Sequence, residues 1–161
     1  MSFGVAKVQG KVVQTVNTQS GTMTTGPNTA LIPFDNTIPQ NGEGTEFMTL
    51  AITPKNTANI LRINVVFNFS ISAIGIISVV ALFQDSVAGA LAVAGCHYSL
   101  ANDLTQLTLA YSMTAGTTSE TTFKVRAGGH NTSVLTFNGR DAGALYGGTL
   151  LSSITITEYT P

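Results

Sequence analysis

The sequence predicts an all-β protein, an antiparallel two-sheet jelly-roll sandwich of about eight to ten strands. Apolar and polar residues alternate along several segments, as in strands that bury one face and expose the other. Segments rich in Gly, Pro, Asn and Asp separate these strands at regular intervals. No segment combines apolar residues at the helical i, i+3, i+4, i+7 spacing with capping residues. The jelly roll fits best because it arranges many short antiparallel strands in two layers.

The first half of the chain contains the clearest alternation. In residues 60–71, alternate apolar side chains from Leu61 to Ile71 share one face, while Arg62, Asn64, Asn68 and Ser70 lie on the other. This pattern predicts a long strand with one buried face. We expect further strands at residues 11–18, 30–34 and 46–53, a loop or short hairpin at 19–29, a turn-rich loop at 35–44 and a turn at 54–59.

The second half continues the same pattern with shorter strands. In residues 105–113, Leu107, Leu109 and Tyr111 share a face, with polar residues between them. The well-patterned final strand indicates that the C-terminal segment pairs inside a sheet. We expect the remaining strands at residues 90–98, around 123–127, at 134–137 and at 150–159, separated by turns at 114–119 and 128–132 and by a Gly-rich loop at 138–148.

The segment 75–84 is apolar on both faces when it is interpreted as a strand. Its Ile and Val pairs are β-branched and favour a strand over a helix. Such a strand needs cover on both sides, and the domain's own core supplies one side. We expect a neighbouring copy of the same protein to cover the other side. The candidate subunit contacts are Ile74, Ile76, Ile77, Val79, Val80, Leu82 and Phe83.

Composition and charge exclude several classes of partner. The 161 residues suit one domain with a full core, and 9% of them are charged, against a usual share of about 25%. The net charge is −1, so no basic face is available for nucleic acid. No apolar run is long enough for membrane insertion, and the first residues do not resemble a secretory signal, so we expect synthesis in a cytoplasm.

Residue types that carry chemistry are few and isolated. Cys96 is the single cysteine, which excludes an intrachain disulfide and a cysteine-based metal site. His97 and His130 lack a nucleophile motif such as G-x-S-x-G. The loop carboxylates show no pair of the kind that a glycosidase needs. A calcium ion bound by Asp35, Asn36, Glu43 and nearby carbonyls is an alternative, although their spacing does not match an EF-hand loop. We therefore expect no enzyme, no cofactor and no metal.

Binding is the better functional hypothesis. Glycans are recognised by aromatic faces together with amide, hydroxyl and charged groups, and recognition sites usually lie on the loops of a rigid scaffold. The predicted loops supply these residue types. The candidate ligand-binding residues are Tyr98, Asn102, His130, Asn131, Asn138, Arg140, Asp141 and Tyr146.

An ordered set of segments resembles a known family. The segments are IPFDNTIPQNGEGTEFMTLAITP (32–54), ALFQDS (81–86), YSMTAGTTSETTFKVRAGG (111–129), TFNGR (136–140) and GGTLLSSITITE (147–158). In them the chain is similar to small C-terminal domains of bacteriophage tail fibre and tailspike proteins, which resemble trimeric jelly rolls of the tumour necrosis factor and complement globular-head type. The resemblance implies a homotrimer packed through an apolar sheet, other phage tail proteins as partners, and a place in the virion tail fibre after synthesis in the bacterial host cytoplasm.

Together these expectations describe a homotrimeric fibre tip that binds a bacterial surface polysaccharide or lipopolysaccharide and does no covalent chemistry. We expect residues 1–29 to form an N-terminal connector with a strand, and residues 30–161 to form the jelly-roll domain. The alternative is a trimerisation or folding clamp that registers the chains of a fibre and binds no ligand. A capsule-degrading enzyme is a third hypothesis, for which the sequence offers no obvious catalytic pair.

Overall fold

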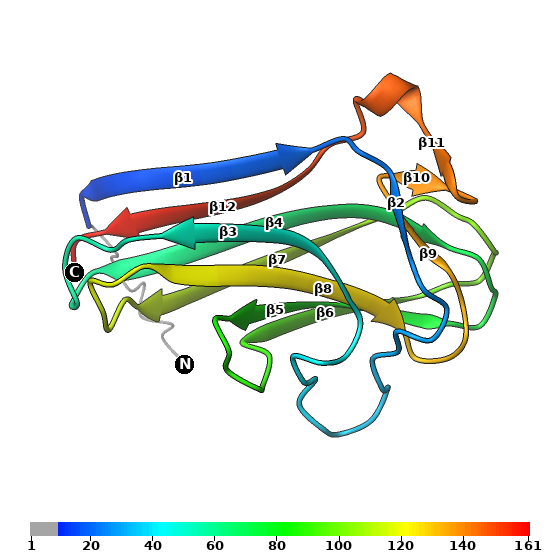
Figure 1. Ribbon diagram of the computed structural model, residues 1–161, viewed down its shortest axis with the longest axis horizontal. Coiled ribbons are helices and arrows are strands. Elements are labelled where there is room, and N and C mark those ends of the chain that lie inside the picture. Colours follow the sequence, from blue (N-terminus) through cyan, green and yellow to red (C-terminus); the bar gives the residue numbers. More distant parts are fainter. Residues whose placement is uncertain (1–9) are drawn as a thin grey trace, which may run out of the picture.

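The computed structural model describes residues 10–161, which form two antiparallel sheets packed against each other (Figure 1). The first sheet contains β1 (Val12–Ser20), β12 (Ser152–Tyr159), β4 (Ile60–Ile71) and β7 (Thr105–Thr114), with β2 (Thr24–Gly26) and β9 (Leu135–Phe137) beside the end of β4. The second sheet contains β3 (Thr45–Ile52), β8 (Thr121–Gly129), β5 (Ile77–Gln84) and β6 (Ala92–His97). A small ribbon of β10 (Gly139–Arg140) and β11 (Gly143–Ala144) and a 3-10 turn (Tyr146–Gly148) precede β12.

The chain crosses repeatedly between the two sheets, and this topology confirms the predicted fold class. β3 and β5 belong to the second sheet, whereas the intervening β4 belongs to the first; the same exchange occurs at β6, β7 and β8. The named strands pair in antiparallel fashion throughout residues 10–161, as in a jelly roll. Eight longer strands make the sandwich, so the predicted number matches them, and four strands of two or three residues complete it.

β4 shows how the alternating pattern produces the core. Its inward side chains at positions 61–71 are at most 1% exposed and lie in the main hydrophobic cluster. Asn64 is exposed on the opposite face, as predicted. Asn68 and Ser70 are buried on that face; Asn68 contacts the chain that leads into β12, and Ser70 lies beside Thr136 of β9. The Asn68 side-chain amide donates to the carbonyl oxygen of Leu151 at 2.9 Å.

β1 and β2 belong to the sandwich rather than to a separate connector. β1 pairs with β12 along its length, and β2 pairs with β9. The side chain of Val16 packs against the main core. The expected boundary at residue 29 is therefore corrected, since residues 12–26 contain two strands of the first sheet. The part of that expectation which concerns residues 1–9 lies outside the described residues.

Residues 30–34 do not form the predicted strand. They belong to a longer segment, residues 27–44, which crosses the outer face of the second sheet and which we name the strap. Ile32 of the strap is fully buried in a second hydrophobic cluster with Val79, Ala81 and Phe83 of β5. The strap therefore supplies an apolar layer over the face of β5 that points away from the main core.

The strap corrects our expectation for the subunit contact. β5 is apolar on both faces, as predicted, with one face in the main core and the other in the cluster under the strap. Both faces are thus covered within one chain, and no neighbouring copy is needed for this purpose. Ile74 is 67% exposed and Ile77 is half-buried, so these two stay accessible. Five of the seven candidate contacts are at most 6% exposed and are not available to a second subunit: Ile76, Val79, Val80, Leu82 and Phe83.

Candidate functional site

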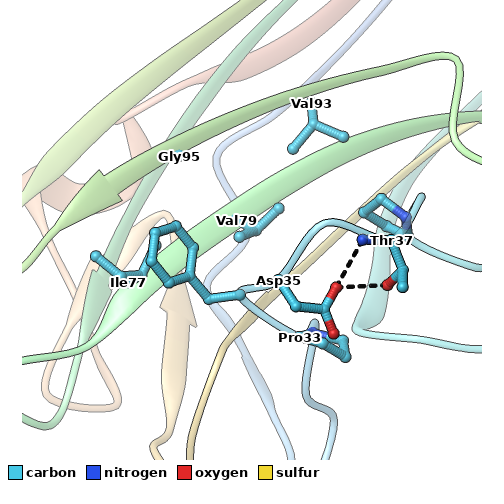
Figure 2. Close-up of a pocket in the computed structure, with 9 residues that line it drawn as sticks. Pro33, Asp35, Thr37, Ile77, Val79, Val93 and Gly95 are labelled. Atoms are coloured by element: carbon cyan, nitrogen blue, oxygen red, sulfur yellow. Dashed lines mark hydrogen bonds between the residues drawn. The ribbon is translucent and has the colours of Figure 1, made fainter.

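A pocket of about 300 Å³ lies between the strap and the outer face of the second sheet (Figure 2). Ile77 and Val79 of β5 and Val93 and Gly95 of β6 form its floor. Val79 and Gly95 are cross-strand partners, so these two positions share one face of the sheet. The wall is formed by strap residues Pro33, Phe34, Asp35, Thr37 and Pro39.

Hydrogen bonds fasten the strap on both sides of the pocket. Before the wall residues, the backbone N–H of Ile32 donates to the carbonyl oxygen of Gly129 at 3.1 Å. Within and after the wall, the N–H of Ala90 donates to the carbonyl oxygen of Pro39 at 2.9 Å, and the Arg126 guanidinium donates to two strap carbonyls. The wall is therefore held in place before any ligand binds, which lowers the entropic cost of binding.

Asp35 is the charged group of the pocket wall. Its Oδ1 accepts hydrogen bonds from the hydroxyl of Thr37 at 2.5 Å and from the backbone N–H of Thr37 at 2.8 Å (Figure 2). These two hydrogen bonds hold the pKa of Asp35 below its usual value, so the carboxylate is ionised at neutral pH. Among the lining residues no side chain is basic. The pocket therefore presents a negatively charged hydrogen-bond acceptor.

Phe34 places an aromatic ring at the mouth of the pocket. The side chain is 69% exposed, and Val93 across the pocket is 47% exposed, so the mouth is an apolar surface. The rings of Phe34 and His130 meet edge-on, with centroids 6.2 Å apart. Nδ1 of His130 accepts the backbone N–H of Ile77 at 3.0 Å, which places the proton of the neutral imidazole on Nε2. His130 thus contacts both the wall and the floor.

The predicted ligand residues lie at one end of the sandwich, but few of them come together. The loops that carry them follow β6, β8 and β9, at the end where β1, β4 and β8 finish (Figure 1). His130 reaches the pocket through Phe34 and Ile77. Within residues 10–161, no side-chain hydrogen bond joins one of the eight predicted residues to another.

Two of the predicted ligand residues are structural instead. Tyr98 is 2% exposed, packs against Phe69, and burial raises the pKa of its hydroxyl. Asn138 is 1% exposed; its amide donates to the carbonyl oxygen of Ser20 at 2.7 Å, and its Oδ1 accepts the hydroxyl of Ser152 at 2.6 Å. Both side chains are enclosed inside the domain, so they are withdrawn from the ligand-binding set.

The remaining five end-loop residues differ in exposure. Asn131, Arg140, Asp141 and Tyr146 are exposed, and Asn102 is half-buried. The backbone φ angles of Asn102, Asp141 and Tyr146 are positive, at 61°, 50° and 50°, as in tight turns. These side chains are accessible to a large ligand that also covers the end of the sandwich.

Sequence reasoning alone does not identify the wall of the pocket. Residues 30–34 fit a strand and residues 35–44 fit a loop, so Phe34 receives no role from local pattern and Asp35 is considered only as a calcium ligand. One signal was present: an aromatic residue and a carboxylate stand together between Pro33 and Pro39 in a turn-rich segment. The floor gave no such signal, because Gly95 and Val93 fit an ordinary strand.

In the part of the chain that the structure describes, no group of three His, Cys, Asp or Glu side chains is placed to hold a metal ion. Glu43, considered above with Asp35 as a calcium ligand, accepts the backbone N–H of Gln40 at 2.9 Å.

Residues 10–161 contain no helix of the length and apolar character that a membrane crossing requires. No protein-family model matches the chain, and no curated protein matches its sequence.

Proposed function

We propose that this protein is the distal receptor-binding domain of a phage tail fibre, a homotrimer that recognises a bacterial surface glycan without covalent chemistry. The observation that carries the proposal is the pocket, in which the exposed ring of Phe34, the carboxylate of Asp35 and an apolar floor meet. Sugars present matching surfaces, since their C–H faces pack on aromatic groups and their hydroxyls donate to carboxylates. The likeness of the sequence to tail fibre domains suggests the bacterial source of the glycan.

The size and rigidity of the pocket support a glycan ligand. A volume of about 300 Å³ is at the lower end for small-molecule sites and suits one sugar residue of a longer chain. A single shallow contact of this kind binds weakly. Three copies on one axis would raise the overall avidity for a repetitive polysaccharide without any new contact.

The outer face of the first sheet supports the trimeric part of the proposal. Arg62 is the single charged residue among the twelve that form its three central cross-strand rows, so identical copies meet there with little charge repulsion. Since the strap covers the outer face of the second sheet, we assign the subunit contact to the first. The rows are Thr15–Thr157–Arg62–Ser112, Asn17–Thr155–Asn64–Ala110 and Gln19–Ser153–Val66–Thr108.

Light scattering after size exclusion should give a molar mass near three times 16.7 kDa. Asn64→Lys places a charge at an exposed position in the middle of the proposed contact and should shift the protein to monomer. Ser119→Lys, at an exposed turn between β7 and β8, is the matched control and should leave the mass unchanged. A monomeric mass for the unaltered protein would contradict the trimer.

On an array of bacterial polysaccharides the protein should bind a subset of glycans, and Phe34→Ala should weaken that binding about tenfold. Loss of an aromatic contact costs about 0.5–1.5 kcal/mol beyond the area that it buries. Folding should be unaffected because Phe34 is exposed. Ile38→Ala removes another exposed strap side chain that does not line the pocket, and it should bind as the unaltered protein does.

The same assay distinguishes the competing hypotheses. A trimer that binds no glycan on the array would indicate a trimerisation clamp. Release of reducing sugar from a bound polysaccharide would indicate an enzyme. Equal glycan binding by the unaltered protein and by Phe34→Ala would indicate that the glycan binds outside the pocket, at the exposed end-loop residues.

A further inference from the structure

We propose that the pocket selects a 2-acetamido sugar, that is, an N-acetylhexosamine residue of the glycan. This inference rests on the proposed glycan-binding function and names the class of sugar that the site takes. It follows from three features of the pocket: an acceptor that needs a donor, a gap in the floor that fits a methyl group, and a charge that disfavours acidic sugars.

The protein engages only one of the two oxygens of the Asp35 carboxylate. Oδ1 of Asp35 is engaged by both donors of Thr37, whereas Oδ2 has no hydrogen bond to any described residue. An ionised carboxylate only accepts hydrogen bonds, so the ligand must bring the donor. The amide N–H of an acetamido group is such a donor, and a hydrogen bond to a charged acceptor is stronger than a neutral one. The engaged Oδ1 fixes the orientation of the carboxylate for this contact.

The floor has room for a small apolar group. Val79 is 5% exposed, and its cross-strand partner on β6 is Gly95, which has no side chain. A Cβ atom at Gly95 would point to the same face as Val79, so its absence leaves a gap beside Val93 and Ile77. An acetyl methyl group placed there leaves water without losing a hydrogen bond. A hydroxyl in the same place would lose its hydrogen bonds to water.

The negative charge of Asp35 favours neutral acetamido sugars over acidic sugars. Asp35 is ionised and no basic side chain lines the pocket, so sugars that carry a carboxylate are repelled. A neutral acetamido sugar meets no such penalty. Phe34 at the mouth offers an aromatic surface to the C–H face of the same ring. The N–H, the methyl group and the sugar ring therefore each have a distinct partner within one pocket.

Saturation-transfer NMR and titration calorimetry on the full chain test the sugar class. N-acetylglucosamine and N-acetylgalactosamine should bind saturably, and their acetyl methyl protons should receive the strongest transfer. Glucose and galactose should bind at least tenfold more weakly, and glucuronic acid should not bind. Equal affinity for glucose and N-acetylglucosamine, or tighter binding of glucosamine with its free ammonium, would overturn the inference.

Two substitutions test the atoms involved. Asp35→Asn keeps an oxygen for Thr37 but replaces Oδ2 with a donor, so N-acetylglucosamine should bind at least tenfold more weakly while the melting midpoint stays unchanged. Gly95→Val fills the floor and should abolish binding; its Cβ would stand 3.3 Å from the carbonyl oxygen of Ser78, which a small shift of the edge strand accommodates. Val93→Phe is a second substitution that fills the pocket, since it places a larger side chain at a 47% exposed position of the floor.

The outcomes separate this inference from the function on which it rests. Ile38→Ala should bind N-acetylglucosamine as the unaltered protein does, because Ile38 does not line the pocket. Binding of N-acetylglucosamine that survives both Asp35→Asn and Val93→Phe would overturn the assignment to this pocket and leave glycan recognition in place elsewhere. The absence of any carbohydrate binding, on the array and in solution, would overturn both proposals.

Discussion

Phe83→Asp is expected to abolish folding of the domain. Phe83 is fully buried on the strap side of β5, in a cluster with Ile32, Val79 and Ala81. Truncation of a buried Phe costs about 3–5 kcal/mol, and a buried carboxylate without a partner adds several more. Because the whole stability of a domain is about 5–15 kcal/mol, the folded population should disappear.

Circular dichroism and soluble yield measure this outcome. Val79→Asp should act in the same direction, since Val79 is 5% exposed. Val93→Asp is the matched control: it introduces the same charge on the same sheet face at a 47% exposed position, and it should fold with a melting midpoint close to that of the unaltered protein. A folded, soluble Phe83→Asp protein would contradict the placement of this face under the strap.

The strap and a neighbouring copy can also be distinguished as the cover of β5. Ile32→Ala shortens the buried strap side chain and should cost about 2–5 kcal/mol. The loss should not depend on protein concentration, because the strap and β5 belong to one chain. A loss that disappears at high protein concentration would indicate that subunit association contributes to the cover.

Glu158→Ala is expected to destabilise the domain by about 3 kcal/mol. Glu158 is 0% exposed and points inward from β12. Its Oε1 accepts the backbone N–H of Lys55 at 2.8 Å and the side-chain amide of Asn59 at 2.5 Å, and its Oε2 accepts the amide of Gln14 at 2.6 Å. Alanine leaves these donors without their acceptor, and the turn between β3 and β4 loses its anchor. Chemical denaturation measures the change, and a loss below about 1 kcal/mol would show that water replaces the carboxylate.

The pKa of Glu158 predicts how stability depends on pH. Burial raises this pKa, but hydrogen bonds from Asn59, Gln14, Lys55 and Asn56 outweigh burial, so the pKa lies below its usual value of 4.5. The carboxylate is thus favoured in the folded state; its contribution is complete above the usual pKa and is lost as the pH falls through the lower folded pKa.

Glu158→Gln provides the test of this pH dependence. At neutral pH the variant should melt at a lower temperature, because its amide offers a donor where the structure supplies only donors. As the pH falls below the usual pKa of 4.5, the melting midpoint of the unaltered protein should approach that of the variant. A gap that stays constant over this range would show that Glu158 does not carry the acid sensitivity.

The sequence by itself determined the class of fold and the inward faces of most strands. Side chains alternate across a strand with a period of two, so the patterns in β4 and β7 predicted their buried faces before any tertiary contact was known. The absence of a helical period predicted an all-β domain. The apolar character of both faces of β5 also predicted that both are covered.

Tertiary structure alone decided what covers each face and where the pocket lies. A strand pattern says that Val79 and Phe83 are buried but not by which segment, and the strap that covers them is distant in the sequence. The turn at Asp35 and the gap at Gly95 come together because backbone hydrogen bonds tie the strap to β8 and to the turn between β5 and β6. The physical reason is that a local pattern records how much a side chain prefers to leave water, whereas its partner depends on the path of the whole chain.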